Sequence, residues 1–122
     1  MLRILTVDDS ASIRKLVRVH LHGQGYLIDE AENGAEGLKL LSKTKYDLLI
    51  VDLMMPVMDG IVMLRMKDAI QNTTPVIVLT AEVNEPLKSA MSNPCVMDYL
   101  KKPPNGSALR AAVAQVLGLE QS

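Results

Sequence analysis

Leu48-Leu49-Ile50-Val51-Asp52 is followed by turn residues at Met55-Pro56 and Asp59-Gly60. The first four residues of this stretch are apolar without alternation, which is typical of a strand buried on both faces. Asp52 therefore lies where a central strand becomes a loop. In open parallel sheets, ligands bind at that carboxyl end of the strands. A lone Asp at such a place is also explained as the cap of a turn, so its neighbours decide between the two.

The composition predicts one globular α/β domain, residues 1–122, with 48% hydrophobic and 22% charged residues. No apolar run is long enough to span a membrane, and no secretory signal peptide precedes the first strand pattern. The single cysteine, Cys95, suits a reducing compartment. We therefore expect a cytoplasmic protein without a membrane partner. A net charge of -1 and a lack of Trp and Phe argue against a nucleic-acid partner.

Strand-like and helical patterns alternate five times along the chain, and this alternation predicts a parallel sheet with helices on both faces. The segment 26–31 is more polar than the other expected strands, which indicates an edge strand. The expected strands are 3–7, 26–31, 48–52, 76–80 and 96–100. The expected helices are 13–21, a helix that starts at the Asn33-Gly34 turn and includes 37–43, 60–71, 82–92 and 105–117. We expect the tail 120–122 to be frayed.

Several polar residues give these helices their ends and faces. Asp59 and Asn105 are placed to cap the third and fifth helices, and Pro86 fits only in a first helical turn. Arg14 and Arg18 fall on the side of the first helix opposite its apolar stripe, which predicts a solvated face.

Polar residues follow four of the five expected strands, and parallel strands bring these ends to one edge of the sheet. They are Asp8-Asp9, Asp52, Thr80 and Lys101-Lys102. At about 4 Å and an effective dielectric constant of about 20, each pair of carboxylates repels by about 4 kcal/mol. Such a cluster requires a divalent cation or raised pKa values, and hard carboxylate oxygens favour Mg²⁺. A Lys and a Thr hydroxyl suit the oxygens of a phosphoryl group. The set predicts phosphoryl transfer onto a carboxylate; the alternative is a solvated acidic rim.

Four stretches, in this order along the chain, resemble the receiver domain of two-component response regulators. They are Val7-Asp8-Asp9-Ser10, Asp52-Leu53-Met54-Met55-Pro56-Val57-Met58-Asp59-Gly60, Leu79-Thr80-Ala81 and Asp98-Tyr99-Leu100-Lys101-Lys102-Pro103. The resemblance covers essentially the whole chain, and its most specific part surrounds Asp52. It implies a flavodoxin-like, doubly wound parallel sheet of five strands in the order 2-1-3-4-5 with five helices.

The resemblance also implies the phosphoacceptor and its metal. Asp52 would take a phosphoryl group from a histidine kinase or a phosphotransfer protein. Asp9, Asp52 and the backbone carbonyl of Met54 would ligate Mg²⁺, and Asp8 would act mainly through a bound water.

The same resemblance implies a switch. Thr80 and Lys102 would contact the phosphoryl group, because Lys102 rather than Lys101 directly precedes Pro103. The Lys102-Pro103 bond is similar to one that is usually cis in the family. Tyr99 matches the aromatic residue that moves with Thr80.

The lifetime of the phosphorylated state depends on a water placed in line behind phosphorus. Met54 and Glu82 flank the expected pocket, two residues after Asp52 and Thr80. The Glu82 carboxylate can orient a water, whereas the Met54 thioether is a weak acceptor whose bulk would shield the phosphoryl group. The alternative is a passive loop side chain at 54 without a kinetic role.

The chain departs from the family pattern at two places. It has Asn93-Pro94-Cys95-Val96-Met97 where the family often has Gly-Ala. The shape of the surface at the fourth helix therefore does not follow from the family resemblance. Pro104 follows Lys102-Pro103 where Phe is frequent, and we expect it to stiffen the entry to the fifth helix. We interpret Cys95 as a small apolar residue.

The favoured function is a signalling receiver, not an enzyme, although it assists its own phosphorylation and dephosphorylation. It would bind a downstream protein through its fourth helix, fifth strand and fifth helix, as a monomer or a phosphorylation-dependent dimer. Its start, Val7 to Lys15, is most similar to the stand-alone chemotaxis type; a phosphorelay intermediate and a piece of a longer regulator stay open. A dehalogenase-like phosphatase would need Asp-x-Asp on the first strand, and an FMN carrier would need a phosphate-binding loop there.

Overall fold

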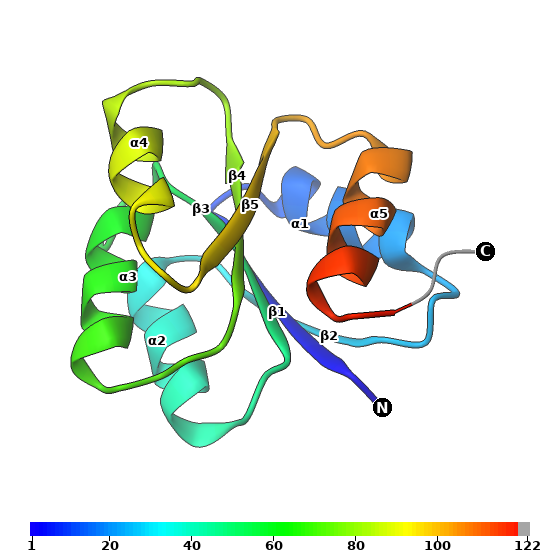
Figure 1. Cartoon of the computed structure of the whole chain (residues 1–122), viewed down its shortest axis with the longest axis horizontal. Helices are drawn as coiled ribbons and strands as arrows, with labels where there is room; N and C mark the ends of the chain where they lie inside the picture. Colours follow the sequence, from blue (N-terminus) through cyan, green and yellow to red (C-terminus); the bar gives the residue numbers. More distant parts are fainter. Residues whose placement is uncertain (120–122) are drawn as a thin grey trace.

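The computed structural model describes residues 1–119 as a parallel five-stranded sheet flanked by helices (Figure 1). The strand order is β2-β1-β3-β4-β5, with every neighbouring pair parallel. The strands are β1 Arg3–Val7, β2 Leu27–Ala31, β3 Leu48–Asp52, β4 Val76–Thr80 and β5 Val96–Lys101. This order confirms the predicted doubly wound, flavodoxin-like α/β fold, and it places the polar strand β2 at an edge.

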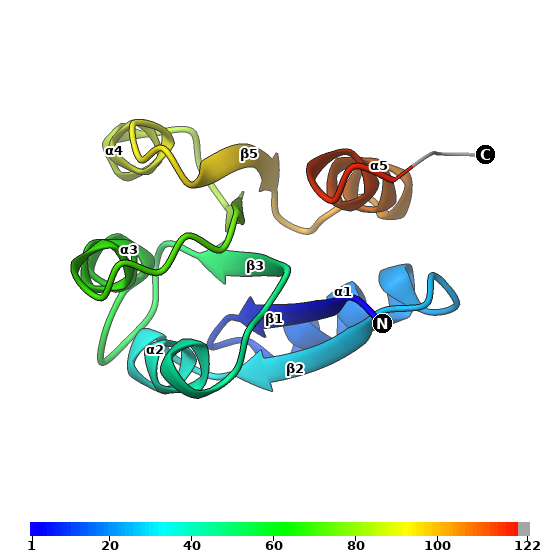
Figure 2. The same ribbon diagram turned by 60° about the horizontal axis from the view of Figure 1, so that its bottom comes forward.

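The helices lie in two layers, one on each face of the sheet (Figure 2). Helices α2, α3 and α4 cover one face, and α1 and α5 pack together on the other. The helices are α1 Ala11–Leu21, α2 Gly34–Lys43, α3 Gly60–Ala69, α4 Glu85–Met91 and α5 Gly106–Val116. No helix within residues 1–119 is both long and apolar enough to cross a membrane.

The two central strands explain why the sheet needs both layers. Every residue of β3 and β4 is buried. Side chains alternate between the faces of a strand. Leu49 and Val51 therefore belong to the core under α2, α3 and α4, while Leu48 and Ile50 belong to the core under α1 and α5. The unbroken apolar run of β3 serves both cores at once.

Each helix starts with a short polar residue whose side chain accepts a hydrogen bond from a backbone N–H of the first turn. These caps are Ser10, Asn33, Asp59, Asn84 and Asn105, of which Asp59 and Asn105 were predicted.

Helix α4 is shorter than the predicted segment 82–92. It begins at Glu85 because Asn84 caps it, with Asn84 Oδ1 accepting from Leu87 N–H. Pro86 falls in the first turn, as predicted. The residues between Thr80 and Asn84 are therefore a loop at the carboxyl edge of the sheet.

Gly60 fixes the path of the loop that follows Asp52. Its N–H donates to the Leu53 carbonyl at 2.9 Å. A Cβ at residue 60 would collide with the Asp52 carbonyl oxygen and lie 2.7 Å from Leu53 Cα. The absence of a side chain lets α3 begin directly against the end of β3, and this fixes the start of the loop that follows Asp52 at the carboxyl edge of the sheet.

Two smaller predictions concern Cys95 and the tail. Cys95 is partly buried and packs against the core under α2, α3 and α4, as expected of a small apolar residue. The tail 120–122, predicted to be frayed, lies outside the described residues.

Candidate functional site

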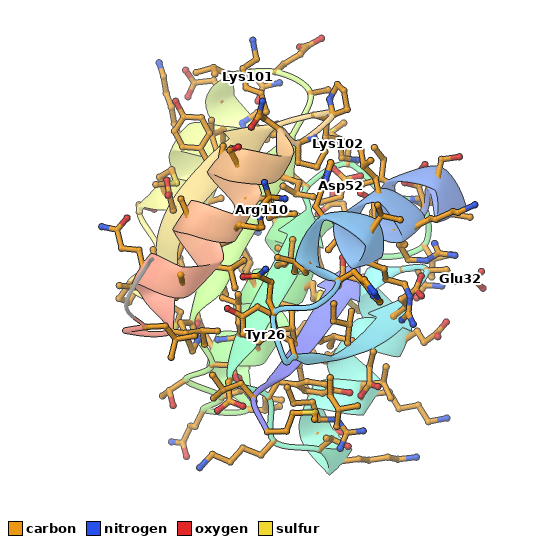
Figure 3. The ribbon with its side chains drawn as sticks, turned by 90° about the vertical axis from the view of Figure 1, so that its right-hand side faces the viewer. Tyr26, Glu32, Asp52, Lys101, Lys102 and Arg110 are labelled. Carbon is orange, nitrogen blue, oxygen red and sulfur yellow. The ribbon has the colours of Figure 1, made fainter. Side chains whose placement is uncertain are left out.

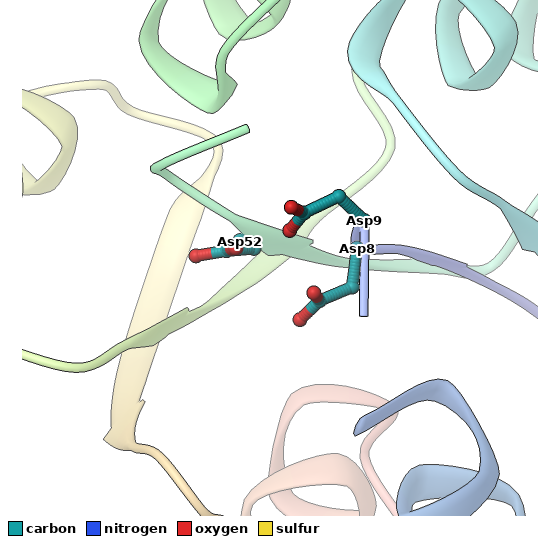
Figure 4. Close-up of side chains that lie close together, drawn as sticks. All are labelled: Asp8, Asp9 and Asp52. Carbon is teal, nitrogen blue, oxygen red and sulfur yellow. The ribbon is translucent and has the colours of Figure 1, made fainter. Parts of the chain in front are cut away.

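Three carboxylates from two neighbouring strands meet at the carboxyl edge of the sheet. Asp8 and Asp9 follow β1, and Asp52 ends β3 (Figure 4). One oxygen from each of the three lies within 4.8 Å of the others. The side chains of Asp8 and Asp52 are buried, whereas Asp9 is exposed. The cluster is thus open to solvent on the Asp9 side only.

Lys102 provides the positive charge that faces these acids. Its Nζ lies 2.8 Å from Asp52 Oδ2 and 2.9 Å from Asp8 Oδ2, and its side chain is 16% exposed. Figure 3 shows Lys102 beside Asp52, with Lys101 farther away. The Lys102 N–H also donates to the Thr80 carbonyl at 2.8 Å, which ties this lysine to β4. The Lys102-Pro103 peptide bond is cis, as the family resemblance implied.

The pKa values of Asp52 and Lys102 both depart from their ordinary values. Burial raises the pKa of Asp52, and the charge of Asp8 raises it further, against the opposing effect of Lys102. Burial lowers the pKa of Lys102, but hydrogen bonds and attraction to Asp52 and Asp8 outweigh it, so the net shift is upward. The protonated lysine is therefore well stabilised, whereas Asp52 carries a charge that its surroundings only partly offset.

The donor set fits a divalent cation of the Mg²⁺ type. Carboxylate oxygens are hard ligands, and Mg²⁺ is usually held by a few of them together with water. Asp8 Oδ2 is buried, and Lys102 Nζ lies 2.9 Å from it. Met54 N–H donates to Asp52 Oδ1 at 3.3 Å, so the Met54 backbone lies directly beside the cluster. These groups leave acceptor capacity that a cation with bound waters would use.

The remaining predicted site residues, Thr80, Tyr99, Met54 and Glu82, differ in their burial. The Thr80 hydroxyl is buried and donates to the Glu82 carbonyl at 2.8 Å. Tyr99 on β5 is 37% exposed, and Met54 is 67% exposed. The Glu82 side chain is exposed. In this structure, then, Thr80 is engaged with its own loop and Tyr99 lies at the surface.

Arg14 is a site residue that the sequence interpretation missed. The helical pattern placed it on a solvated face, but its side chain is only 16% exposed. Its guanidinium donates to the Asp8 carbonyl and to Glu30 on β2. A helical pattern shows which side chains face away from the core beneath the helix. It does not show that a long side chain such as Arg14 extends to the end of a neighbouring strand.

The two departures from the family pattern have local partners in the structure. Asn93 Nδ2 donates to Asp68 on α3, and Asn93 Oδ1 accepts from Cys95 N–H. The loop before β5 is thereby tied to α3. Pro104 is buried at the entry to α5.

Residues 4–114 match the family model for the response regulator receiver domain. The chain belongs to this family. It is 33% identical to the chemotaxis protein CheY4 of Vibrio cholerae, with a TM-score of 0.85, covering 95% of this chain and 98% of the other. It is 35% identical to the response regulator TrrA of Thermotoga maritima, solved in complex with Mg(2+)-BeF, with a TM-score of 0.81, covering 95% and 99% of the two chains.

Curated receiver-containing relatives are longer than this chain. Over 101 residues it is 43% identical to the transcriptional regulatory protein ResD of Bacillus subtilis, covering 83% of this chain and 42% of ResD. Over 119 residues it is 40% identical to the transcriptional regulatory protein GlrR of Escherichia coli, covering 98% of this chain and 26% of GlrR. The chain thus spans less than half the length of either protein.

Proposed function

We propose that residues 1–122 form one receiver domain that takes a phosphoryl group from a histidine kinase or phosphotransfer protein onto Asp52, with Mg²⁺ bound by Asp8, Asp9 and Asp52. The observation that carries this proposal is the cluster of three carboxylate oxygens within 4.8 Å at the carboxyl edge of the sheet, with one lysine facing it. Structural acids are normally matched by opposite charges, whereas this cluster has more negative than positive charge.

The residues of the cluster have different roles in the phosphoryl transfer. An oxygen of the Asp52 carboxylate attacks the phosphorus of a phosphohistidine. As the new O–P bond forms, the N–P bond breaks and the imidazole leaves. When bound, Mg²⁺ supplies positive charge that offsets the charge on the moving phosphoryl oxygens. Asp8 and Asp9 would hold that ion or its waters, and the Met54 carbonyl would be a further protein ligand.

Lys102 provides the second positive charge. Its Nζ lies 2.8 Å from Asp52 Oδ2. It is therefore next to the carboxylate group of which one oxygen would become bonded to phosphorus. A compact ammonium can exchange this carboxylate for a phosphoryl oxygen without losing a charged partner. Asp8 remains as its other contact.

Phosphorylation of Asp52 would change the protein surface through movements of Thr80 and Tyr99. The Thr80 hydroxyl would leave the Glu82 carbonyl and donate to a phosphoryl oxygen. That movement would draw the loop 80–84 toward Asp52 and open space for the Tyr99 ring. Tyr99 has an apolar ring and a polar tip, so it can occupy an inner or an outer position at modest cost.

The output surface we propose consists of α4, β5 and α5. Exposed apolar side chains lie on its first two elements, Met91 on α4 and Met97 and Tyr99 on β5, and exposed Val83 lies in the loop just before α4. A partner protein would cover them in the phosphorylated state, either a separate target, as the likeness to a chemotaxis protein suggests, or a second copy. The setting would be the cytoplasm, where histidine kinases deliver the phosphoryl group.

The lifetime of the phosphorylated state would depend on Met54 and Glu82. Both side chains are exposed; Met54 belongs to the loop that follows β3, and Glu82 to the loop that follows β4. Glu82 would orient the attacking water, and the apolar Met54 would keep water away from phosphorus.

The test is labelling with a small phosphodonor such as acetyl phosphate in Mg²⁺, followed by intact-protein mass spectrometry. Wild type should gain one phosphoryl group and Asp52→Asn none. Asp47→Asn is the matched control, because Asp47 lies just before the opposite end of the same strand and accepts from Arg3 N–H. It should label like wild type. Labelling of Asp52→Asn at wild-type stoichiometry would overturn the assignment.

A further inference from the structure

We infer that Arg14 is a positioning residue for the Mg²⁺ site, acting through the backbone carbonyl of Asp8. The inference rests on the proposed function, since it assigns a role in the same site. Arg14 Nη1 donates to the Asp8 carbonyl at 2.6 Å, and Arg14 Nε donates to Glu30 Oε1 at 3.0 Å. The guanidinium therefore joins the loop of the metal acids to the edge strand β2.

The geometry of a guanidinium makes this link directional. Its N–H groups lie in one plane and point in fixed directions, unlike the freely rotating ammonium of a lysine. With Nε held by Glu30, the direction of Nη1 is set. The carbonyl that accepts from Nη1 belongs to the peptide unit between Asp8 and Asp9. Arg14 thus fixes the plane of the peptide from which both acids extend.

Two further hydrogen bonds fix the position of Asp8. Its N–H donates to the Ala31 carbonyl at 3.1 Å, and its Oδ1 accepts from Ser10 N–H at 2.9 Å. Its carbonyl is the remaining polar backbone group, and Arg14 is the side chain that binds it. Without that bond, the peptide plane between Asp8 and Asp9 could rotate while the Asp8 side chain kept its contacts.

Asp9 would be most affected by such a rotation. Its carboxylate is exposed and has no hydrogen bond or ion pair within the described part of the chain. The backbone alone therefore directs it toward Asp8 and Asp52. A change in the peptide plane would move the Asp9 oxygen out of the cluster while Asp8 and Asp52 stayed in place.

Arg18 provides a matched control one turn along the same helix. It also pairs with Glu30, at 3.2 Å, and it donates to the Ile28 carbonyl at 3.1 Å. Among the described residues it has no hydrogen bond or ion pair with Asp8. The two arginines thus share Glu30 as an acidic partner. The second bond of Arg14 goes to the Asp8 carbonyl, whereas that of Arg18 goes to the Ile28 carbonyl, and Arg18 is more exposed.

The experiment compares Arg14→Met with Arg18→Met by calorimetric titration with Mg²⁺ alone and by amide NMR of the metal-free proteins. Outer contacts that orient metal ligands are typically worth about 10–100-fold in affinity, and we expect about tenfold weaker binding for Arg14→Met. Arg18→Met should bind like wild type. The amide signals of Asp9 and Ser10 should shift only in Arg14→Met. Arg14→Lys, which can still donate to the carbonyl, should fall between Arg14→Met and wild type.

Wild-type Mg²⁺ affinity in a folded Arg14→Met would overturn the inference, as would equal weakening in both Met variants, which would indicate a general loss of the α1–β2 contact. If Arg14→Met does not fold, Arg14→Lys against Arg18→Lys decides in the same way. A failure of the proposed function would look different, since wild type itself would not bind Mg²⁺.

Discussion

The carboxylates at the two ends of the sheet differ in how fully their charges are matched by hydrogen-bond donors and cations. Toward the amino end, the Arg3 guanidinium lies 2.9 Å from Asp29 Oδ2, and Tyr46 Oη donates to the same oxygen at 2.7 Å. The Arg3 N–H donates to Asp47 at 2.8 Å. Here the carboxylates have hydrogen-bond donors or a cation as direct partners, and these contacts stabilise the fold.

At the carboxyl end, Lys102 pairs with Asp8 and Asp52, while the nearby Asp9 has no ion pair among the described residues. Asp8 and Asp52 are buried, and burial first and then the charge of Asp8 raise the pKa of Asp52. The difference teaches that polar residues at the amino end serve the folded structure, whereas those at the carboxyl end are arranged for a ligand that brings positive charge. Removing a carboxylate charge should therefore destabilise the fold at the amino end and stabilise it at the carboxyl end.

The largest expected effect on stability comes from Lys102→Met in Mg²⁺-free buffer at pH 7. The substitution leaves the buried Asp8 and Asp52 without a counter-charge, and breaking such a pair costs roughly 3 kcal/mol of unfolding free energy. Urea unfolding measures this loss. Lys101→Met is the control, because Lys101 is exposed, and it should have little effect. Equal losses for both lysines would show that Lys102 does not neutralise the cluster.

Tyr46→Phe tests the amino end and should destabilise by about 1.5 kcal/mol, the usual contribution of a hydrogen bond to a charged group. Burial first, and then Asp29, raise the pKa of Tyr46 from 10.0 to about 12. The unfolded chain loses this proton first, so wild-type stability should fall as pH rises from about 10 to 12. That fall should be smaller in Tyr46→Phe, in which the raised pKa values of Tyr26 and Lys102 still lower stability at high pH. A variant as stable as wild type would remove the contrast between the two ends.

Asp52→Asn should raise the unfolding free energy at pH 7 without Mg²⁺, since burial first and then the charge of Asp8 raise the pKa of Asp52 in the folded state. The folded state holds the Asp52 proton more tightly than the unfolded state, whose pKa is near 3.8. Ionised Asp52 therefore destabilises the fold at neutral pH, and this penalty disappears as pH falls toward 3.8. Unfolding curves across this range should converge at low pH. A gain that is independent of pH would need another cause.

Met54→Asn should have the smallest effect on stability, within about 0.5 kcal/mol, because Met54 is 67% exposed. It should instead shorten the lifetime of the phosphorylated state several-fold, since an amide can hold water where the thioether cannot. Phosphoryl loss after donor removal gives the rate, and Mg²⁺ affinity should stay unchanged because the metal contact there is backbone. Equal or slower loss would show that Met54 does not set the lifetime.

The sheet and most helix starts were predictable because they depend on local chemistry. The buried runs of β3 and β4 have no alternation, and Asp59 and Asn105 stand directly before helical patterns. The convergence of Asp8, Asp9 and Asp52 followed from one topological rule, that parallel strands end at the same edge.

What the sequence missed depends on contacts between distant residues or on competing caps. The start of α4 was misplaced because Asn84 competes with Glu82 as the first polar residue, and only the hydrogen bond to Leu87 N–H decides between them. The contact of Arg14 with the Asp8 carbonyl depends on how α1 lies across β1 and β2. No periodicity in the sequence encodes that crossing.

The most direct test of the account is urea unfolding of wild type and Asp52→Asn, each without Mg²⁺ and with Mg²⁺ at about 100 times the wild-type dissociation constant. Wild type should gain roughly 2.7 kcal/mol from the metal. Asp52→Asn, which lacks one carboxylate ligand, should gain clearly less. The order of stability should reverse: Asp52→Asn should be the more stable protein without Mg²⁺, and wild type the more stable with it. An Asp52→Asn variant that is less stable than wild type in metal-free buffer, or that gains as much from Mg²⁺, would contradict it.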